Sequence, residues 1–236
     1  MINDKDQWWQ PFKSIGDIDV FHVDLTPHVG YEAEALAWLD GEERSRWERF
    51  QSLAARRRFV LCRAALRSVL CRKSGCTNES LEFIASNFGK PYARVGGKPV
   101  AMSFNVSHSG KHGLIAVAPR GELGVDVEER SQHRNLEVLI EGVLSPQEIA
   151  ELRARDDRQR QCLFFRFWTI KEALVKAHGK GVSLDVARLE IPEDMRHGAI
   201  RSKGQFTQLS NTTWHLEDIG SDDFAAAIVY EAGPAS

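Results

Sequence analysis

Residues 168–181, WTIKEALVKAHGKG, hold the densest set of side chains that could do chemistry. A helix would place Trp168, Glu172 and Lys176 at i, i+4 and i+8 on one face, before the glycines end it. A carboxylate beside an ammonium on a rigid support suits the binding of a metal ion or an anion. The alternative is an exposed Glu–Lys pair, which adds only about 0.3–0.5 kcal/mol to a helix.

A second acidic segment lies at residues 123–128, LGVDVE. Its period of two predicts a strand with the apolar residues on one face and Gly124, Asp126 and Glu128 on the other. Two like charges this close repel each other, so a bound cation would explain why both are present. A strand edge that merely faces water is the alternative.

Glu172 would add a third hard oxygen ligand to Asp126 and Glu128. Mg²⁺ prefers oxygen ligands in octahedral geometry, keeps several waters and is commonly held by a few carboxylates together with substrate phosphates. These residues therefore predict a magnesium site that acts on a substrate carrying a pyrophosphate.

A third segment, residues 104–110, FNVSHSG, begins as a strand and ends in small hydroxyl residues and glycine. Such a turn can bring backbone N–H groups and His108 against an anion. A hydrolase pair of Ser107 and His108 is disfavoured because neighbours on a strand point to opposite faces. A zinc pair of His108 and His112 is disfavoured because Gly110 and Gly113 argue against the helix it needs.

The three segments, in this order and spacing, resemble the 4'-phosphopantetheinyl transferase superfamily, specifically the monomeric surfactin-type (Sfp-like) group. The resemblance spans roughly residues 42–185 in motif-bearing segments. It also includes a Gly-Lys-Pro turn at residues 89–91. It implies an α+β fold of two similar subdomains, residues 1–120 and 121–236, each a small antiparallel sheet packed with a long helix, with the active site in the cleft between them.

The resemblance also implies roles for individual residues. The Mg²⁺ ligands would be Asp126, Glu128 and Glu172. The contacts to coenzyme A would be Arg46, Arg58, Lys90, Ser107, His108 and Lys176, with Arg46 and Arg58 on the ribose 3'-phosphate. The catalytic residues would be Glu172, Lys176 and Glu148, and either Glu148 or Glu172 would be the general base.

The implied reaction is the Mg²⁺-dependent transfer of the 4'-phosphopantetheine arm of coenzyme A to a serine hydroxyl of an apo acyl or peptidyl carrier protein. Adenosine 3',5'-bisphosphate would leave, as in holo-acyl-carrier-protein synthases. The carrier protein would serve fatty acid, polyketide or nonribosomal peptide synthesis. A non-catalytic module that binds coenzyme A or a carrier protein is the alternative, and a Mg²⁺-dependent phosphohydrolase is a third hypothesis.

Composition limits the partners and the location. The 236 residues are 42% hydrophobic and 27% charged with a formal net charge of −2, which is ordinary for a globular protein and not for a nucleic-acid-binding one. The basic run at residues 43–73 is interrupted by Glu43 and Glu48 and carries no nucleic-acid motif. Free thiols, no secretory signal and no long apolar run predict a cytoplasmic protein without a membrane partner. The family resemblance implies a monomer.

Hydrophobic periodicity predicts the elements that position these residues. Helices are expected over residues 31–51, 55–73, 135–142, 146–155 and 158–178. Strands are expected over residues 19–25, 81–86, 102–108, 112–118, 123–128, 188–191, 214–219 and 224–230. The basic helix and the anion turn then fall in the first half, and the carboxylates fall in the second.

Overall fold

The computed structural model describes residues 8–85, 89–130, 136–179, 184–209 and 212–231. The chain divides into two compact units. Unit 1 comprises Met1–Asn87 and Pro91–Pro119, and unit 2 comprises Phe88–Lys90 and Arg120–Ser236. Each unit combines antiparallel sheet with helices, so the expected α+β class is confirmed.

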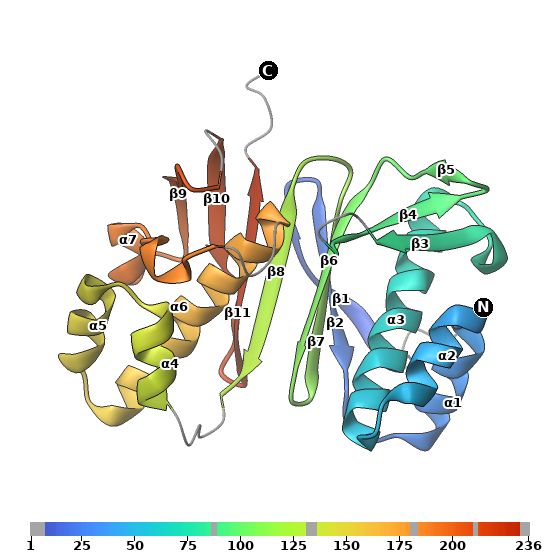
Figure 1. The fold of residues 1–236 in the computed structure, drawn as a ribbon, viewed down its shortest axis with the longest axis horizontal. Coiled ribbons are helices and arrows are strands. Elements are labelled where there is room, and N and C mark those ends of the chain that lie inside the picture. The colour runs from blue at the N-terminus through green and yellow to red at the C-terminus, as the bar shows by residue number, and fades with distance from the viewer. Residues whose placement is uncertain (1–7, 86–88, 131–135, 180–183, 210–211, 232–236) are drawn as a thin grey trace. The chain divides into compact units, whose positions relative to one another are not determined.

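Unit 1 is built on a four-stranded antiparallel sheet. Its strand order is β1 (Trp9–Ile15), β2 (Ile18–Asp24), β7 (His112–Ala118) and β6 (Ser103–Ser109). The helices are α1 (Val29–Trp38), α2 (Gly41–Arg49) and α3 (Leu53–Ser74), of which α3 packs on the sheet (Figure 1). A short 3-10 turn, Asn78–Ser80, leads into a small second sheet of β3 (Leu81–Ala85), β4 (Pro91–Val95) and β5 (Lys98–Pro99).

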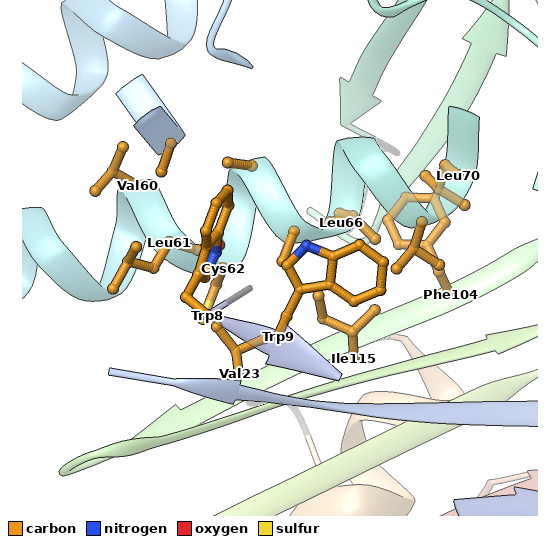
Figure 2. Packing of buried hydrophobic residues seen from close by; sticks show 14 of the residues in the cluster. Trp8, Trp9, Val23, Val60, Leu61, Cys62, Leu66, Leu70, Phe104 and Ile115 are labelled. Atoms are coloured by element: carbon orange, nitrogen blue, oxygen red, sulfur yellow. The ribbon is translucent and has the colours of Figure 1, made fainter. Parts of the chain in front are cut away.

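Helix α3 forms the centre of unit 1, because it packs on both the sheet and α1 and nearly all of its residues from Val60 to Cys71 are buried. The Ser52 side chain caps its first turn, and Gly75, at a φ of 66°, ends it in the left-handed conformation. Figure 2 shows Trp8 and Trp9 packed against Leu61 and Leu66 of this helix. These contacts hold α3 in a fixed orientation on the sheet.

Unit 2 repeats the plan. Its sheet has the order β8 (Leu123–Glu129), β11 (Phe224–Glu231), β10 (Thr213–Asp218) and β9 (Arg201–Gln205), all antiparallel. Helix α6 (Asp157–His178) packs on β8 and β11 (Figure 1). The remaining helices are α4 (Leu136–Val143), α5 (Pro146–Arg153) and α7 (Glu193–Arg196), with a 3-10 turn at Val186–Arg188.

Helix α6 is anchored by its apolar face. Phe164, Phe167 and Ile170 are buried in a cluster that also holds Trp214 of β10. Asp156 caps the first turn through its side chain, and Gly179 follows the helix with a φ of 74°. Although α3 and α6 are long, none of the helices in the described ranges has both the length and the apolar character that crossing a bilayer requires.

The structure corrects two of the expected elements. Residues 31–51 form two helices instead of one, because Leu39 is extended and Asp40 caps the start of α2 with its side chain. Residues 188–191 are not a strand, since they follow a 3-10 turn while Leu189 and Ile191 fill the core of unit 2. Four strands were not among the expected elements, namely β1, β4, β5 and β9.

Each long helix carries a buried cation at its fifteenth residue. Arg67 of α3 donates from Nε to Glu43 Oε2 at 2.7 Å, and Lys171 of α6 lies 2.6 Å from Glu148 Oε2. Glu43 and Glu148 are both the N3 residue of a capping box at the start of a short helix. The same ion pair therefore ties a short helix to the long one in both units.

Candidate active site

The carboxylates expected to bind metal gather where β8 meets α6. Asp126 of β8 is buried with 3% of its surface exposed, and its Oδ1 accepts from Lys176 Nζ at 2.6 Å. Glu172 lies one helical turn before Lys176 and is half-buried. Strand and helix thus bring an acid pair and an ammonium together, as the two sequence periods predict.

Gly124 allows this close approach of strand and helix. A Cβ added at Gly124 would collide with the carbonyl oxygen of Ala173 and the amide nitrogen of Ala177. Both of those residues lie on the buried face of α6. Only a glycine lets the two backbones meet here, so Gly124 sets how near the side chains of β8 lie to those of α6.

The electrostatics show how crowded the carboxylates are. Burial, and next the negative charge of Asp126, raise the pKa of Glu172, while Lys176 opposes that rise and Glu128 adds to it. Asp126, Glu128 and Lys176 therefore all lie within range of the charge of Glu172. Added positive charge would relieve the repulsion between the carboxylates.

The donor set fits Mg²⁺, which prefers hard carboxylate oxygens and keeps several waters. Lys176 contacts one oxygen of Asp126. Among the described residues, no three His, Cys, Asp or Glu side chains form a ready metal cage as they stand. Phosphate oxygens and water would complete the coordination, as is usual for this ion.

Glu148, the other expected general base, lies apart from these carboxylates. It is 1% exposed, and Oε2 accepts from the backbone amide of Ser145 at 2.8 Å in addition to its pair with Lys171. Oε1 accepts from the amide of Ile191 at 3.0 Å. Both oxygens are therefore engaged inside the core, where a serine hydroxyl has no access.

Lys90, expected to contact the nucleotide, ties β8 to α6. Its Nζ donates to the carbonyl of Ala177 at 2.9 Å and to that of Leu123 at 3.3 Å, and it pairs with Glu122 at 2.6 Å. Its side chain also packs over Gly179. The ammonium joins the last turn of the helix to the first residue of the strand, the two elements that carry the acidic residues.

A separate pocket in unit 1 brings Arg46 and His108 together. It encloses about 210 Å³ between α3, the β6 face that carries Phe104 and His108, and the ends of α2 and β4. It is lined by Arg46, Phe59, Cys62, Arg63, Leu66, Pro91, Phe104, Asn105, Val106 and His108. Two expected phosphate contacts thus meet in one concave site.

Arg58 and Ser107 are not among the residues that line this pocket. Ser107 is buried and, as the strand neighbour of His108, points to the opposite face of β6. Arg58 is half-buried near the Cys62 thiol, whose pKa burial raises to about 12. The end of the helix motif, at Lys180 and Gly181, lies outside the described residues.

Sequence reasoning missed Arg63, which lines the pocket beside Arg46. The available signal was its position four residues after Phe59 on the helix that carries the basic run, which places both on one face. Arg63 could not be singled out within the run of arginines, because the spacing of these residues does not show which side chains line a pocket, which form structural ion pairs and which face water.

Comparisons with known proteins give both units the same family name. A model described as the 4'-phosphopantetheinyl transferase superfamily matches residues 122–229, and one described as 4'-phosphopantetheinyl transferase, N-terminal, matches residues 26–120. The two matches between them span most of both units.

Individual relatives agree. The chain is 34% identical over 202 residues to the protein slr0495 of Synechocystis sp., which covers 82% of this chain and 78% of that protein. It is 31% identical over 217 residues to the 4'-phosphopantetheinyl transferase HetI of Nostoc sp., covering 92% and 88%. It is 29% identical over 149 residues to Sfp of Bacillus subtilis, covering 63% and 64%. The chain belongs to the Sfp-like group of the 4'-phosphopantetheinyl transferase superfamily.

Proposed function

We propose that this transferase moves the 4'-phosphopantetheine arm of coenzyme A to a serine of an apo acyl or peptidyl carrier protein. The reaction depends on Mg²⁺ and releases adenosine 3',5'-bisphosphate. The observation that carries the proposal is the contact of Asp126 with Lys176 beside a half-buried Glu172 whose pKa is raised. An ordinary solvated strand edge would hold its carboxylates in water instead.

The proposed metal ligands are Asp126, Glu128 and Glu172. When bound, Mg²⁺ would neutralise negative charge that grows on the diphosphate as the bond to phosphorus breaks. Lys176 would add a point cation for the same oxygens once it turns from Asp126 toward the substrate. Mg²⁺ and Lys176 would both stabilise charge that develops only in the transition state, and this would lower the activation barrier.

We assign the general base to Glu172 and a structural role to Glu148. A serine hydroxyl is a weak nucleophile at neutral pH and needs a positioned carboxylate to accept its proton. Glu172 is half-buried beside Asp126 and Lys176, where the substrate diphosphate would bind, so it is placed for this proton transfer. Glu148 has no oxygen free for that role, because Lys171 and two backbone amides occupy both.

We also propose that the chain acts as a monomer and that it recognises a carrier protein of fatty acid, polyketide or nonribosomal peptide synthesis. The relatives named as 4'-phosphopantetheinyl transferases support this kind of partner. Two compact units in one chain supply both the basic pocket and the acidic cluster without a second copy.

The test is the intact mass of an apo carrier protein after incubation with the protein, coenzyme A and Mg²⁺. We expect a gain of one phosphopantetheine arm, which EDTA abolishes and added Mg²⁺ restores. Asp126→Asn should remove the gain while thermal unfolding shows that the protein remains folded.

Other outcomes identify the other hypotheses. Free phosphopantetheine without a modified carrier protein would indicate a phosphohydrolase. Coenzyme A binding without any mass gain across several carrier proteins would indicate a binding module. A full mass gain in the presence of EDTA would contradict the proposed metal dependence.

A further inference from the structure

Two free thiols, those of Cys71 and Cys76, lie side by side at the C-terminal end of α3. Their Sγ atoms are 3.7 Å apart, and the S–H of Cys76 donates to the sulfur of Cys71. A disulfide bond brings two sulfurs to about 2.05 Å, and rotation of the side chains can supply the remaining approach. The pair is therefore within reach of bond formation in the folded protein.

The end of the helix holds the two cysteines together. Gly75 follows α3 with a φ of 66°, and the amide of Cys76 then donates to the carbonyl of Cys71 at 3.2 Å. A left-handed residue after a helix turns the chain back over the last turn, where side chains from the two segments meet. The Ser74 hydroxyl also lies 3.1 Å from the Cys76 sulfur. The local backbone thus keeps both thiols in contact.

The two thiols differ in their surroundings. Cys71 is buried in the apolar cluster of unit 1, whereas Cys76 is half-buried at its margin. Burial, first of all, raises the pKa of Cys71 to about 12; the hydrogen bond and the charge of Cys76 raise it further, Arg67 opposes them and Glu79 adds to them. Cys71 is therefore a thiol at neutral pH, and Cys76 is the sulfur that a small oxidant in solution reaches first.

We propose that Cys71 and Cys76 are an oxidation site, at which a peroxide converts the two thiols into a reversible intramolecular disulfide. In the first step the Cys76 sulfur attacks the peroxide, the O–O bond breaks, and a sulfenic acid and one water form. In the second step the Cys71 sulfur attacks the Cys76 sulfur, and the S–O bond breaks. The departing hydroxide takes the proton of Cys71 and leaves as a second water.

The first step prepares the second. Once Cys76 is an uncharged sulfenic acid, its negative charge no longer holds the proton on Cys71, and the positive charge of Arg67 remains to favour the Cys71 thiolate. The buried thiol thus becomes reactive only after the half-buried one has been oxidised. Cys76 is the attacking residue in this order, and Cys71 is the resolving residue.

The test is peptide mapping of the wild-type protein after brief exposure to hydrogen peroxide. Free thiols are blocked with N-ethylmaleimide in denaturant before digestion with trypsin. Trypsin cuts after Arg72 and Lys73, so Cys71 and Cys76 fall on separate peptides that only a disulfide can join. We expect the joined peptides as the main oxidation product, and their separation after treatment with dithiothreitol. Cys62, whose pKa burial raises to about 12, should stay reduced.

Three variants assign the steps, with circular dichroism to show that each is folded. Cys162→Ser is the matched control, because Cys162 is exposed on α6 and should not be needed for the joined peptides. Cys71→Ser should leave Cys76 as a sulfenic acid that dimedone labels. Cys76→Ser should leave Cys71 reduced. If Cys71→Ser does not fold, the wild-type map and Cys76→Ser decide.

The melting temperature gives a second readout. The disulfide would close a ring of only six residues, so it should restrict the unfolded chain modestly and raise the melting temperature of the oxidised wild-type protein slightly. Cys76→Ser should show no such rise.

Several results would overturn the proposal. One is oxidation of Cys162 while Cys71 and Cys76 remain reduced. Another is Cys76 driven to sulfinic acid with Cys71 still free, which would show that the two sulfurs cannot meet. Joined peptides that come only from cross-linked pairs of chains would also reject it, as would a lower melting temperature after oxidation, since the bond would then strain the fold.

Discussion

The two units share one scaffold but expose opposite charges. Helices α3 and α6 are both 22 residues long and both pack on a four-stranded antiparallel sheet. Arg67 and Lys171 occupy the same position in them and pair with the capping-box residues Glu43 and Glu148. The open sites differ, because unit 1 carries a pocket with two arginines and unit 2 carries the carboxylate cluster.

This difference teaches how to separate structural charges from functional ones. The structural charge of Glu148 is buried, and both of its carboxylate oxygens are engaged. The charge that we propose to be functional, that of Glu172, is only half-buried and is crowded by like charges. Sequence motif alone does not distinguish Glu148 from Glu172, whereas burial and partners do.

The largest expected effect on stability comes from Glu148→Ala. Removing this carboxylate leaves Lys171 buried without its counter-ion, which costs about 3–5 kcal/mol. Burial already lowers the pKa of Lys171, and the negative charge of Glu148 opposes this effect. Removing Glu148 should therefore lower the pKa of Lys171 further. At pH values between this lowered pKa and the usual 10.5, Lys171 is protonated in the unfolded state but not in the folded state. The free energy of unfolding of the variant should therefore increase as the pH rises through this range.

Denaturant unfolding of Glu148→Ala at several pH values measures both effects. The double variant Glu148→Met with Lys171→Met is the control, because replacing both partners by apolar groups should recover much of the loss. A Glu148→Ala protein that is as stable as the wild type would show that the two units are not held by equivalent ion pairs.

Gly124→Ala compares the helix–sheet contact of unit 2 with that of unit 1. In unit 2 the added methyl meets the backbone of α6, and overpacking of this kind costs about 1–3 kcal/mol or more. In unit 1 the equivalent change, Gly113→Ala, meets the Cys62 Sγ at 2.8 Å, which can rotate away, and the Val23 Cβ at 3.1 Å, which needs only a small shift of its strand. We expect a larger fall in melting temperature for Gly124→Ala than for Gly113→Ala.

Gly142→Ala provides the reference for these two variants. Gly142 lies within α4, and an added Cβ meets nothing within 4 Å. Alanine in a helix should therefore stabilise the protein by roughly 0.4–1 kcal/mol. If Gly113→Ala proved as harmful as Gly124→Ala, the backbone contact in unit 2 would have no special importance.

Glu43→Ala should cost less than Glu148→Ala, about 1.5–3 kcal/mol for the lost charged hydrogen bond. Arg67 keeps Asp40, Asn78 and the Leu81 carbonyl as partners, whereas the carboxylate of Glu148 is the counter-ion that Lys171 loses. Parallel urea titrations of the two variants measure the difference. The reverse order would contradict the assignment of Arg67 as the better-satisfied cation.

Lys90→Met should have the smallest effect on stability, about 0.5–1.5 kcal/mol in all, since its contacts lie at a partly exposed site where water can replace them. Because Lys90 ties Leu123 to Ala177, we expect kcat to fall several-fold through misplacement of the acidic residues, with KM for coenzyme A unchanged. A rise in KM without a fall in kcat would instead support the nucleotide contact that the family resemblance implies.

Strong periodicity made several elements predictable. Helix α6 was expected over residues 158–178 and spans Asp157–His178, because an apolar face and a terminal Gly179 mark it. Strand β7 has the expected bounds, since its apolar run follows a glycine turn. The meeting of Asp126 with Lys176 also follows from the two periods combined.

Other features carried no such signal. Strands β1 and β9 are edge strands with mostly exposed residues, so they lack the alternation that marks a half-buried strand. Proline in β4 and β5 argued against strands there. The burial of Glu148 and of Arg63 depends on tertiary neighbours distant in sequence, which no local pattern encodes.

The most direct test of this account is the transfer assay by intact mass for Glu172→Gln and Glu148→Gln, each with its melting temperature. We predict that Glu172→Gln stays folded and modifies no carrier protein. Glu148→Gln should melt at a lower temperature but still modify the carrier protein below that temperature. A folded Glu148→Gln without transfer, together with an active Glu172→Gln, would contradict the assignment of chemistry and scaffold to these two glutamates.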